Sequence, residues 1–586
     1  MGLLKKINFI LNRKQKINLI ILFFVILLGT LMELAGVSII LPFVQAIVEP
    51  DALMQKSYVI KICELLNIKE MNQLLIGLSF VLIGIYVFKN IYLCLMNNLI
   101  YRFIYNNQRR LANKMFNCYM SQPYVFHLSR NSSEMIRNIV GDSAMFFSAV
   151  LAFLQLLTEI SVCLVLVLFL LFFVDKSVTI GISLILLIFV VLYVKLIKVK
   201  IQEMGETTRE CQKNMTKWIQ QGFGGIKEVK ILGREQFFIK QYDQTYRIFA
   251  GANRSYVVYS YLPKPMMETF CIGGMMLVII LKLYRGVDLS YFAPMMSVFA
   301  IAAFRMMPSA GRIAQYINNI AYNRPAVDAV YNSLRDIEKL TDDGSQTKQG
   351  SAEFEFTEAI NIQNLSFRYP NVESNVLENV SMRIPKNHSV AFVGPSGAGK
   401  TTLADIILGV LEPGSGAVLA DDVNVHENLY GWNKHLGYIP QAIYLTDDTI
   451  RNNVAFGIEP EEIDDERVWN ALEGAQLKSF VEGLEKGLNT IAGERGARLS
   501  GGQRQRIGIA RALYRDPDVL VLDEATSALD TDTETAVMEA IENLSGKKTI
   551  IIIAHRLTTI RNCDMVYEIN NGTVSLQKVK GEQREP

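Results

Sequence analysis

The sequence contains few of the residues that build disulfide frameworks and metal centres. Only seven of its 586 residues are cysteines, and no two of them form a CxxC pair. Cysteines this scattered support neither a disulfide framework nor a zinc site, so we expect reduced side chains that serve in packing. Charge of one sign is also scarce, because 59 basic and 57 acidic residues leave a formal net charge of +2. That balance gives no indication of a nucleic-acid partner.

Long apolar runs are confined to one part of the chain. Residues 1–335 are crowded with them, whereas residues 355–586 alternate polar and apolar residues as soluble proteins do. The mean hydropathy of +0.21 therefore combines two chemistries. The segment between has no large apolar residue from Thr341 to Ser351 and is rich in turn formers, which is typical of a linker. Since 586 residues also exceed what one core serves, we expect a membrane domain over 1–335, a linker over 336–354 and a soluble domain over 355–586.

Six stretches are long and apolar enough to cross a bilayer as helices, since about 20 residues span the hydrocarbon core. They are residues 17–47, 74–99, 145–174, 178–196, 261–283 and 289–307. The first follows five bases with no acid among them, and it is far longer than the apolar core of a signal peptide. The segments after the second and fourth stretches are long and basic. By the positive-inside tendency, the N-terminus and the soluble domain face the cytoplasm.

Three polar stretches separate these spans. Residues 101–142 and 198–260 mix apolar and charged residues at helical spacing, with glycines at 222, 224 and 225 that predict a break. Because neither has a linker or a core of its own, we expect helical hairpins that project towards a soluble partner domain. Residues 51–72 place apolar residues among charges, which fits either a short amphipathic helix at the outer surface or a polar loop.

Charged residues inside the apolar stretches are candidates for transport chemistry, because a charge at the membrane centre costs about 3 kcal/mol or more unless it faces protein or water. They are Glu33, Lys89, Glu159, Lys264, Glu268, Arg305 and Arg312. Arg305 and Arg312 share a helix face, being two turns apart. Three interpretations stay open: a basic cavity wall for an anionic substrate, internal ion pairs such as Glu268 with Arg305, and an ion relay. The candidate cavity residues are Lys89, Lys264, Arg305 and Arg312.

A phosphate-binding loop opens the soluble half. A buried strand over 389–393 runs directly into GPSGAGKTT and then into an apolar-periodic helix, which is the context that GxxxxGK[ST] requires. The backbone N–H groups and the helix N-terminus attract phosphates, Lys400 bridges them, and the Thr401 hydroxyl is a Mg²⁺ ligand. The candidate nucleotide-binding residues are Gly394, Ser396, Gly397, Gly399, Lys400, Thr401 and Thr402.

A second buried strand, 519–522, ends in two acids. Asp523 is placed to hold Mg²⁺, directly or through water. Glu524, one residue further, is placed to accept the proton of the water that attacks the γ-phosphate. The pair predicts a hydrolytic site.

The segment Leu499-Ser500-Gly501-Gly502-Gln503 lies between these two motifs. With it, residues 355–586 resemble the ATP-binding cassettes of ABC proteins, an α/β P-loop NTPase fold. The resemblance implies that Ser500, Gly501, Gly502 and Gln503 contact the ATP held by an opposite cassette, so that a second chain completes each site. It also implies roles for three further residues: Tyr369 stacks on the adenine, Gln441 senses Mg²⁺ and the attacking water, and His555 contacts the γ-phosphate. Because every motif is intact, an ATPase and a homodimer are favoured.

Gly493-Glu494-Arg495-Gly496 resembles the loop that couples exporter cassettes to their membrane helices. Together with six preceding spans, it makes the chain resemble a type IV ABC exporter, with an α-helical transmembrane domain fused to the cassette. Residues 304–313, with Lys89 and Lys264, resemble bacterial lipid-linked oligosaccharide flippases of the protein-glycosylation type. Two positions carry Lys where those flippases are expected to carry Arg, which keeps the charge but loses bidentate phosphate binding.

This resemblance implies a multi-pass protein of the bacterial inner membrane that binds ATP and Mg²⁺. Its expected activity is ATP-driven flipping of a polyprenyl-pyrophosphate glycan. Export of another lipid, a peptide or a drug-like amphiphile is the alternative.

Overall fold

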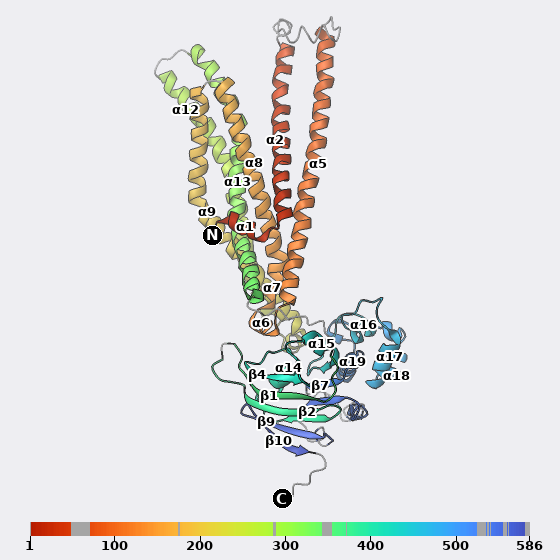
Figure 1. The fold of residues 1–586 in the computed structure, drawn as a ribbon. Coiled ribbons are helices and arrows are strands. Elements are labelled where there is room, and N and C mark those ends of the chain that lie inside the picture. Colours follow the sequence, from red (N-terminus) through yellow and green to blue (C-terminus); the bar gives the residue numbers. More distant parts are fainter. Residues whose placement is uncertain are drawn as a thin grey trace. The chain divides into compact units, whose positions relative to one another are not determined.

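The computed structural model describes residues 2–48, 71–173, 176–284, 289–342, 354–370, 372–523, 541–554 and 562–579, with the single residues 535, 538, 539 and 560. They form two units, whose elements Figure 1 labels. The first unit comprises Met1–Gln122 and Arg130–Leu340, and the second comprises Pro123–Ser129 and Thr341–Pro586. Each unit is described by itself.

Long helices build the first unit. In chain order they are α1 (Leu3–Ile10), α2 (Arg13–Val48), α5 (Met71–Met120), α7 (Ser132–Arg137), the π-helical turn η1 (Asn138–Asp142), α8 (Ser143–Phe173), α9 (Lys176–Gly224), α10 (Ile226–Ile231), α11 (Glu235–Tyr261), α12 (Pro263–Tyr284) and α13 (Leu289–Asp342). Each predicted apolar stretch falls on a different long helix: α2, α5, α8, α9, α12 or α13. Among the described residues, three helical segments are long and apolar enough to cross a membrane, Arg13–Met32, Leu75–Met120 and Ser132–Val165.

The polar stretches of this unit are helical, as their spacing predicts. α9 continues far beyond its apolar stretch to Gly224, and α11 returns beside it. The predicted glycine break is confirmed, because α9 ends at Gly224 and Gly225 caps α10. A β-carbon on Gly205 would lie 2.0 Å from the carbonyl oxygen of Tyr322, so glycine is what allows α9 and α13 to cross so closely. Residues 51–70, where the amphipathic segment is expected, lie outside the described residues.

Two sheets form the framework of the second unit. Their strands are β1 (Ala359–Phe367), β2 (Leu377–Pro385), β3 (Ser389–Val393), β4 (Ser415–Ala420), β5 (Val423–Asn424), β6 (Leu436–Ile439), β7 (Val519–Asp523), β8 (Thr549–Ile553), β9 (Met565–Asn570) and β10 (Thr573–Val579). An antiparallel sheet has the order β2-β1-β4-β5, and a six-stranded sheet has the order β10-β9-β3-β8-β7-β6. In the second sheet β6, β7, β8, β3 and β9 are parallel. β7 and β8 are buried along their whole length, as parallel strands covered on both faces are.

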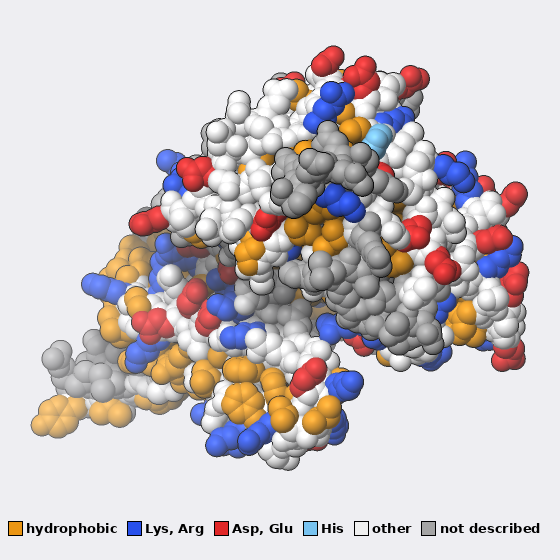
Figure 2. Space-filling view, turned by 90° about the horizontal axis from the view of Figure 1, so that it is seen from below, with side chains coloured by type: hydrophobic (Ala, Val, Ile, Leu, Met, Phe, Trp, Pro, Cys, Tyr) orange, Lys and Arg blue, Asp and Glu red, His pale blue; other side chains and the backbone are white. Residues whose placement is uncertain are grey.

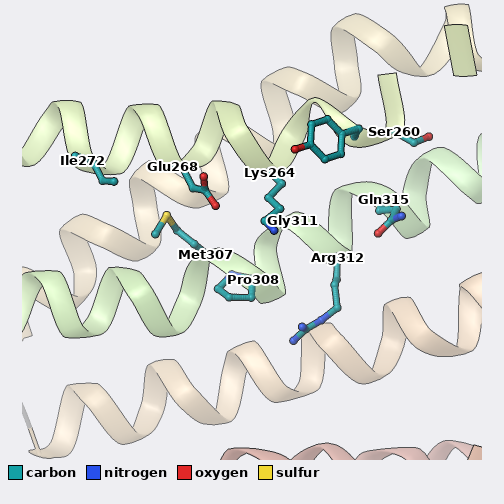
Figure 3. Close-up of a pocket in the computed structure, with 10 residues that line it drawn as sticks. Ser260, Lys264, Glu268, Ile272, Met307, Pro308, Gly311, Arg312 and Gln315 are labelled. Carbon is teal, nitrogen blue, oxygen red and sulfur yellow. The ribbon is translucent and has the colours of Figure 1, made fainter. Parts of the chain in front are cut away.

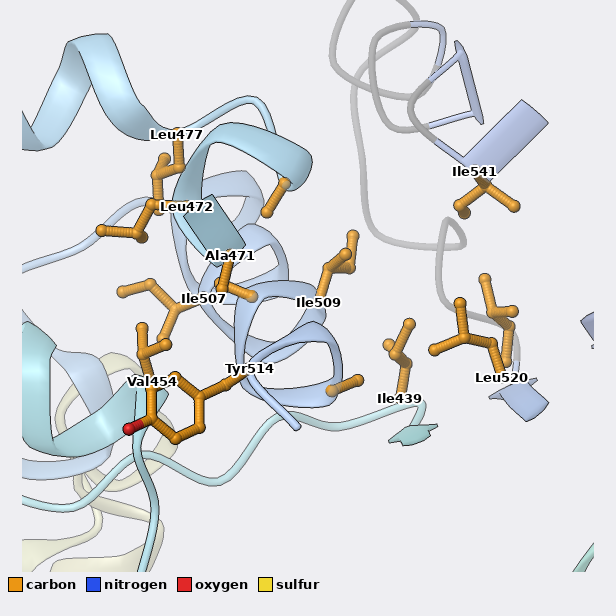
Figure 4. Packing of buried hydrophobic residues seen from close by; sticks show 14 of the residues in the cluster. Ile439, Val454, Ala471, Leu472, Leu477, Ile507, Ile509, Tyr514, Leu520 and Ile541 are labelled. Atoms are coloured by element: carbon orange, nitrogen blue, oxygen red, sulfur yellow. The ribbon is translucent and has the colours of Figure 1, made fainter. Parts of the chain in front are cut away.

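Short helices surround these sheets. They are α6 (Tyr124–Ser129), α14 (Lys400–Ile407), α15 (Leu429–His435), α16 (Ile450–Val454), α17 (Asp465–Gly474), α18 (Lys478–Glu482), the 3-10 turns η2 (Gly487–Asn489) and η3 (Glu494–Gly496), and α19 (Gly501–Leu513). α19 lies within a hydrophobic cluster of the unit, in which its Ile507 lies towards Val454 and Leu472 and its Ile509 lies on the other side of the helix (Figure 4). Five cysteines in the described part of the chain are free thiols, as their spacing predicts.

Acidic and basic side chains are interspersed on the face that Figure 2 shows. That distribution matches the near balance of 59 basic and 57 acidic residues in the sequence. Surfaces of this kind lack the single-sign field that attracts polyelectrolytes.

Candidate functional site

The phosphate-binding loop is held in a backbone shape that requires glycine at two positions. Gly394 follows β3 with φ +142°, and a β-carbon there would lie 2.1 Å from the carbonyl oxygen of Ile569. Gly399 caps α14 with φ +104°, where a β-carbon would lie 2.9 Å from Leu377 Cδ2. Left-handed backbone of this kind strains any residue with a side chain. The loop therefore turns from the strand directly into the first N–H groups of α14, which is a favourable anion site.

Lys400 lies over this loop. Its Nζ donates to the carbonyl oxygens of Gly394 and Pro395, both at 2.9 Å, and only 6% of the residue is exposed. An ammonium held against a phosphate-binding loop is suited to bridging phosphate oxygens. Thr401 follows on the first turn of α14, with its side chain exposed, and Ser396 and Gly397 lie in the loop itself.

Tyr369 is anchored beside the phosphate loop. Its hydroxyl lies 3.2 Å from Thr402 Oγ1, and its ring packs edge-on to Phe367 with centroids 5.0 Å apart. The structure thus brings together two candidate residues that are separated by 33 positions in the chain. An aromatic face at this position is available for stacking on a base.

Asp523 lies at the same edge of the sheet as the phosphate loop. It ends β7 and is paired with Ile553 of β8, which on its other side is paired with Phe392 of β3. The carboxyl ends of parallel strands lie at one edge of a sheet. Asp523, at the end of β7, and Gly394, directly after β3, therefore lie at the same edge. Its side chain is largely buried, at 7% exposure. Glu524 and His555, which follow β7 and β8 in the sequence, lie outside the described residues.

Two more side chains gather near Asp523. Burial and the charge of Asp523 raise the pKa of Asp405, on α14, to about 6. Burial, and then the charges of Asp523, Asp405 and Tyr124, raise the pKa of Tyr438 on β6. Gln441 follows β6 by two residues, and Ile439 of β6 is paired with Leu522 of β7, so the glutamine also emerges at this edge. Hydroxyl, carboxylate and amide oxygens are the donors that Mg²⁺ prefers.

Asp405→Asn is expected to stabilise the full-length protein by about 1 kcal/mol at pH 7.5, allowing for solvent screening at this half-buried site. Folding raises the pKa of this carboxyl, so the ionised form is unfavourable in the folded state above pH 6. That cost fades as the pH falls from 6 towards 4. Thermal unfolding at pH 7.5 and 4.5, with EDTA to keep divalent cations away from Asp523, measures the difference. An equal gain in stability at both pH values would show that the ionisation of Asp405 is not the cause of the stabilisation.

The signature segment begins α19. Ser500 is the N-cap: its Oγ accepts from Gln503 N at 3.2 Å, and Gln503 Oε1 accepts from Ser500 N at 2.9 Å. This capping box fixes the first turn and leaves Ser500 and Gly501 exposed, with Gly502 and Gln503 partly exposed. A β-carbon on Gly501 would meet no atom within 4 Å. Among the described residues, the space beside Gly501 at the N-terminus of α19 is thus open, and a helix N-terminus favours an anion.

The loop before the signature contacts the segment that follows Gln441. η3 includes Arg495 at φ +52°, and a β-carbon on Gly496 would lie 2.7 Å from Leu445 Cδ1. Arg511, which the sequence did not single out, ties the same segment to α19 by donating to the carbonyl oxygens of Tyr444 and Asn453, both at 2.8 Å. The segment after Gln441 therefore contacts both η3 and α19.

The sequence also did not single out α6. Residues 123–129 belong to the cassette unit although they lie between α5 and α7 in the chain, and Val125 packs against the cassette core. Pro123, after a helix that ends at Met120, was the available signal, because proline marks a break in a helix. The contact between α6 and the cassette core therefore lies within this unit.

The membrane half contains a cavity of about 580 Å³ between α12 and α13. Lys264 and Glu268 line it from α12, and Gly311, Arg312 and Gln315 line it from α13 (Figure 3). Two of the predicted cavity residues, Lys264 and Arg312, thus line the same cavity. Lys89 is not among the lining residues and instead places its Nζ 4.5 Å from the ring centroid of Tyr86. The side chain of Arg305 lies outside the described residues.

Arg312 forms an ion pair that the sequence did not predict. Its Nε donates to Glu159 Oε1 at 2.5 Å, and its Nη2 donates to Glu159 Oε2 at 3.3 Å and to Ser309 Oγ at 3.2 Å. The Glu159 side chain is 8% exposed and that of Arg312 is 41% exposed. Arg312 points away from Lys264 (Figure 3), and among the described residues Lys264 forms no ion pair. Of the two bases that line the cavity, Arg312 is therefore neutralised by Glu159, whereas Lys264 has no ion-pair partner among the described residues.

Comparison with known proteins matches both halves of the chain. Residues 377–527 match the family model described as ABC transporter, and residues 19–285 match the model described as ABC transporter transmembrane region. The ATP-dependent lipid A-core flippase of Francisella tularensis strain SCHU S4 is 33% identical over 65% of this chain and 62% of its own length. That of Cupriavidus metallidurans is 26% identical over 80% of this chain and 78% of its own length.

The match thus spans less than two thirds of the length of the Francisella relatives. A solved structure described as a bacterial Atm1-family ABC exporter with ATP bound has the same fold, with a TM-score of 0.71 at 22% identity over 96% of this chain and 94% of that one.

Proposed function

Because the chain belongs to the ABC transporter family, as a half-transporter with one transmembrane region and one cassette, we propose that it is an ATPase that exports or flips an amphiphilic substrate. The observation that carries the ATPase is the single sheet edge at which the phosphate loop, Asp523 and Gln441 emerge. Lys400 and the N–H groups of α14 bind the phosphates, and Tyr369 supports the base. Bound Mg²⁺ would be held by Thr401, Asp523 and Gln441 and would offset charge on the phosphates. Glu524 takes the proton of the attacking water, and His555 contacts the γ-phosphate.

The partner is a second copy of this chain. The first turn of α19 is capped within its own chain, yet Ser500 and Gly501 remain exposed. A helix N-terminus that presents free N–H groups suits the γ-phosphate of a nucleotide held by another cassette. One chain carries both halves of the site, so a two-fold dimer completes two sites with identical chemistry.

The substrate is a lipid-linked glycan with a pyrophosphate head, moved outward across the bacterial inner membrane, with the N-terminus and the cassette in the cytoplasm. Lys264 in the cavity between α12 and α13 supports an anionic head, because its charge has no ion-pair partner among the described residues. The relatives are named lipid A-core flippases, which supports a lipid. Another lipid, a peptide or a drug-like amphiphile is the alternative. ATP-dependent translocation of a polyprenyl-pyrophosphate glycan in proteoliposomes, run beside a simple phospholipid, separates the two.

The role of Arg312 is tested with a single and a double variant. Replacing Arg312 alone leaves Glu159 buried without its counter-ion, which costs about 3 kcal/mol or more of stability. We expect Arg312→Gln to lower the thermal stability, and Glu159→Gln with Arg312→Gln to restore it. If Arg312 contacts the substrate, the double variant still loses at least tenfold of the substrate-stimulated ATPase. Recovery of full stimulation in the double variant would mean that Arg312 serves only to neutralise Glu159. Lys264→Gln removes the other base of the cavity, and it is expected to lower the substrate-stimulated ATPase without lowering the thermal stability.

A further inference from the structure

A groove of about 300 Å³ lies between α2 and α5, apart from the cavity between α12 and α13. Two hydrogen bonds between these helices lie at its ends. At one end Gln15 Nε2 donates to Asn107 Oδ1 at 2.8 Å, and at the other the Tyr92 hydroxyl donates to the Val25 carbonyl oxygen at 2.8 Å. The two helices are antiparallel neighbours (Figure 1), so the groove has a defined direction from Gln15 towards Val25.

The chemistry of the groove changes along that direction. Near Gln15 it is lined by Asn18 from α2 and by Asn106 and Arg110 from α5. Arg102 lies one to two turns nearer the other end, where Val25 and Leu99 supply aliphatic surface. No acid is among the lining residues that the structure describes. With Arg110 and amides at one end, Arg102 further along and aliphatic side chains at the other end, the groove matches the polarity of a lipid.

Neither arginine is neutralised. In the described part of the chain Arg102 and Arg110 form no ion pair, and both are exposed. They are eight residues apart and share one helix face. A guanidinium binds a phosphate with two parallel hydrogen bonds and is more weakly hydrated than an ammonium. Two unpaired guanidinium groups above a row of amides are therefore suited to a phosphodiester.

The depth of the groove fits the same ligand. The apolar stretch of α5 ends near Leu99, so Arg102 lies at the cytoplasmic boundary predicted by the distribution of bases, and Arg110 lies about 12 Å further towards the cytoplasm along the helix. Phosphates of the inner leaflet lie at that boundary, and basic pockets between helices on this side bind anionic headgroups. A volume of 300 Å³ accommodates a small headgroup and the start of a chain, whereas an oligosaccharide is larger.

We propose that this groove binds an anionic glycerophospholipid of the cytoplasmic leaflet, with its phosphate between Arg102 and Arg110 and its acyl chain along Val25 and Leu99. The bound lipid fastens α2 to α5 beyond the two hydrogen bonds. This site is distinct from the proposed transport cavity and takes a different lipid from the proposed cargo.

Native mass spectrometry of the full-length protein in detergent, without ATP or glycan, tests the site. Phosphatidylglycerol is titrated against wild type, Arg102→Gln with Arg110→Gln, and the control Arg109→Gln, an exposed neighbour that does not line the groove. We expect the double variant to bind phosphatidylglycerol at least tenfold more weakly, the control to match wild type, and phosphatidylcholine to bind more weakly than phosphatidylglycerol to wild type.

Equal binding by the double variant and wild type would overturn the proposal, as would an equal loss in the control. Displacement of the lipid by millimolar inorganic phosphate would assign the groove to a soluble anion instead. If the double variant is poorly folded, Arg102→Lys with Arg110→Lys keeps the charge and is expected to bind between two- and tenfold more weakly; undiminished binding by it would also overturn bidentate recognition of a phosphate. Failure here leaves the transport proposal intact, since no step measures translocation.

Discussion

Glu524→Gln is expected to reduce ATP hydrolysis by about a hundredfold or more while ATP still binds. Glutamine keeps the size of the side chain but cannot accept the proton of the attacking water, and general-base catalysis contributes about 10² to 10⁴ in rate. Binding is expected to survive because the groups proposed to hold the nucleotide, Lys400 and the first turn of α14, are unchanged. Steady-state phosphate release and the affinity for a fluorescent ATP analogue are measured on the same preparation.

Glu539→Gln is the matched control for that experiment. Glu539 is an exposed acid in the segment that follows β7, so it tests the loss of one carboxylate without touching the proposed chemistry. Hydrolysis by Glu524→Gln within tenfold of wild type would remove Glu524 as the base. A loss of ATP affinity equal to the loss of rate would instead assign it to binding.

Gly501→Asp is expected to abolish hydrolysis in the homodimer, with a loss of about a hundredfold or more. The new side chain has room in its own chain, since a β-carbon at Gly501 meets nothing within 4 Å, so the chain is expected to fold. An acid at the N-terminus of α19 replaces an anion-binding position with a negative charge, which repels the γ-phosphate of the partner's ATP. Gly501→Ala adds the β-carbon without the charge and serves as the control.

Mixed dimers locate the two halves of each ATP site. With Lys400→Ala in one chain and Gly501→Asp in the other, both changes damage the same composite site, so one complete site remains. With both changes in one chain beside a wild-type chain, each composite site has one damaged half. We expect the first arrangement to occlude as much ATP as a dimer of wild type with Lys400→Ala, and the second to occlude at least tenfold less. The reverse order would mean that each cassette completes its own site.

Local motifs in the sequence were sufficient for much of the ATP site. The strand over 389–393 and the strand that ends at Asp523 were predictable because each is a short apolar run, buried throughout in β7 and at every residue but Val393 in β3. Each is followed by residues whose expected roles depend on spacing alone. The break at Gly224 and Gly225 was likewise a local signal. Such features depend on neighbours a few positions away, which is the information that a single sequence contains.

Pairings between distant elements were not predictable in this way. Arg312 pairs with Glu159, 153 positions away. The sequence instead suggested a pair between Glu268 and Arg305, which lies on the same helix as Arg312. The contact between Tyr369 and Thr402 joins residues far apart in the sequence, and so does the packing of Val125 on the cassette core. Local sequence patterns do not predict such contacts. A helix in an apolar setting exposes apolar side chains all round, so hydropathy does not say which face meets which neighbour.

The sequence by itself determined the family and the two kinds of domain, and it predicted the residues proposed to hold ATP, because the signature, the phosphate loop and the acidic strand end are local arrangements with local physical requirements. The tertiary structure alone decided how charge is distributed in the membrane half. Rotation and depth of packed helices leave Lys264 in a cavity, neutralise Arg312 with Glu159, and align Arg102 and Arg110 along a groove. The positions of these side chains depend on how the helices pack against one another, which residue spacing along the chain does not specify.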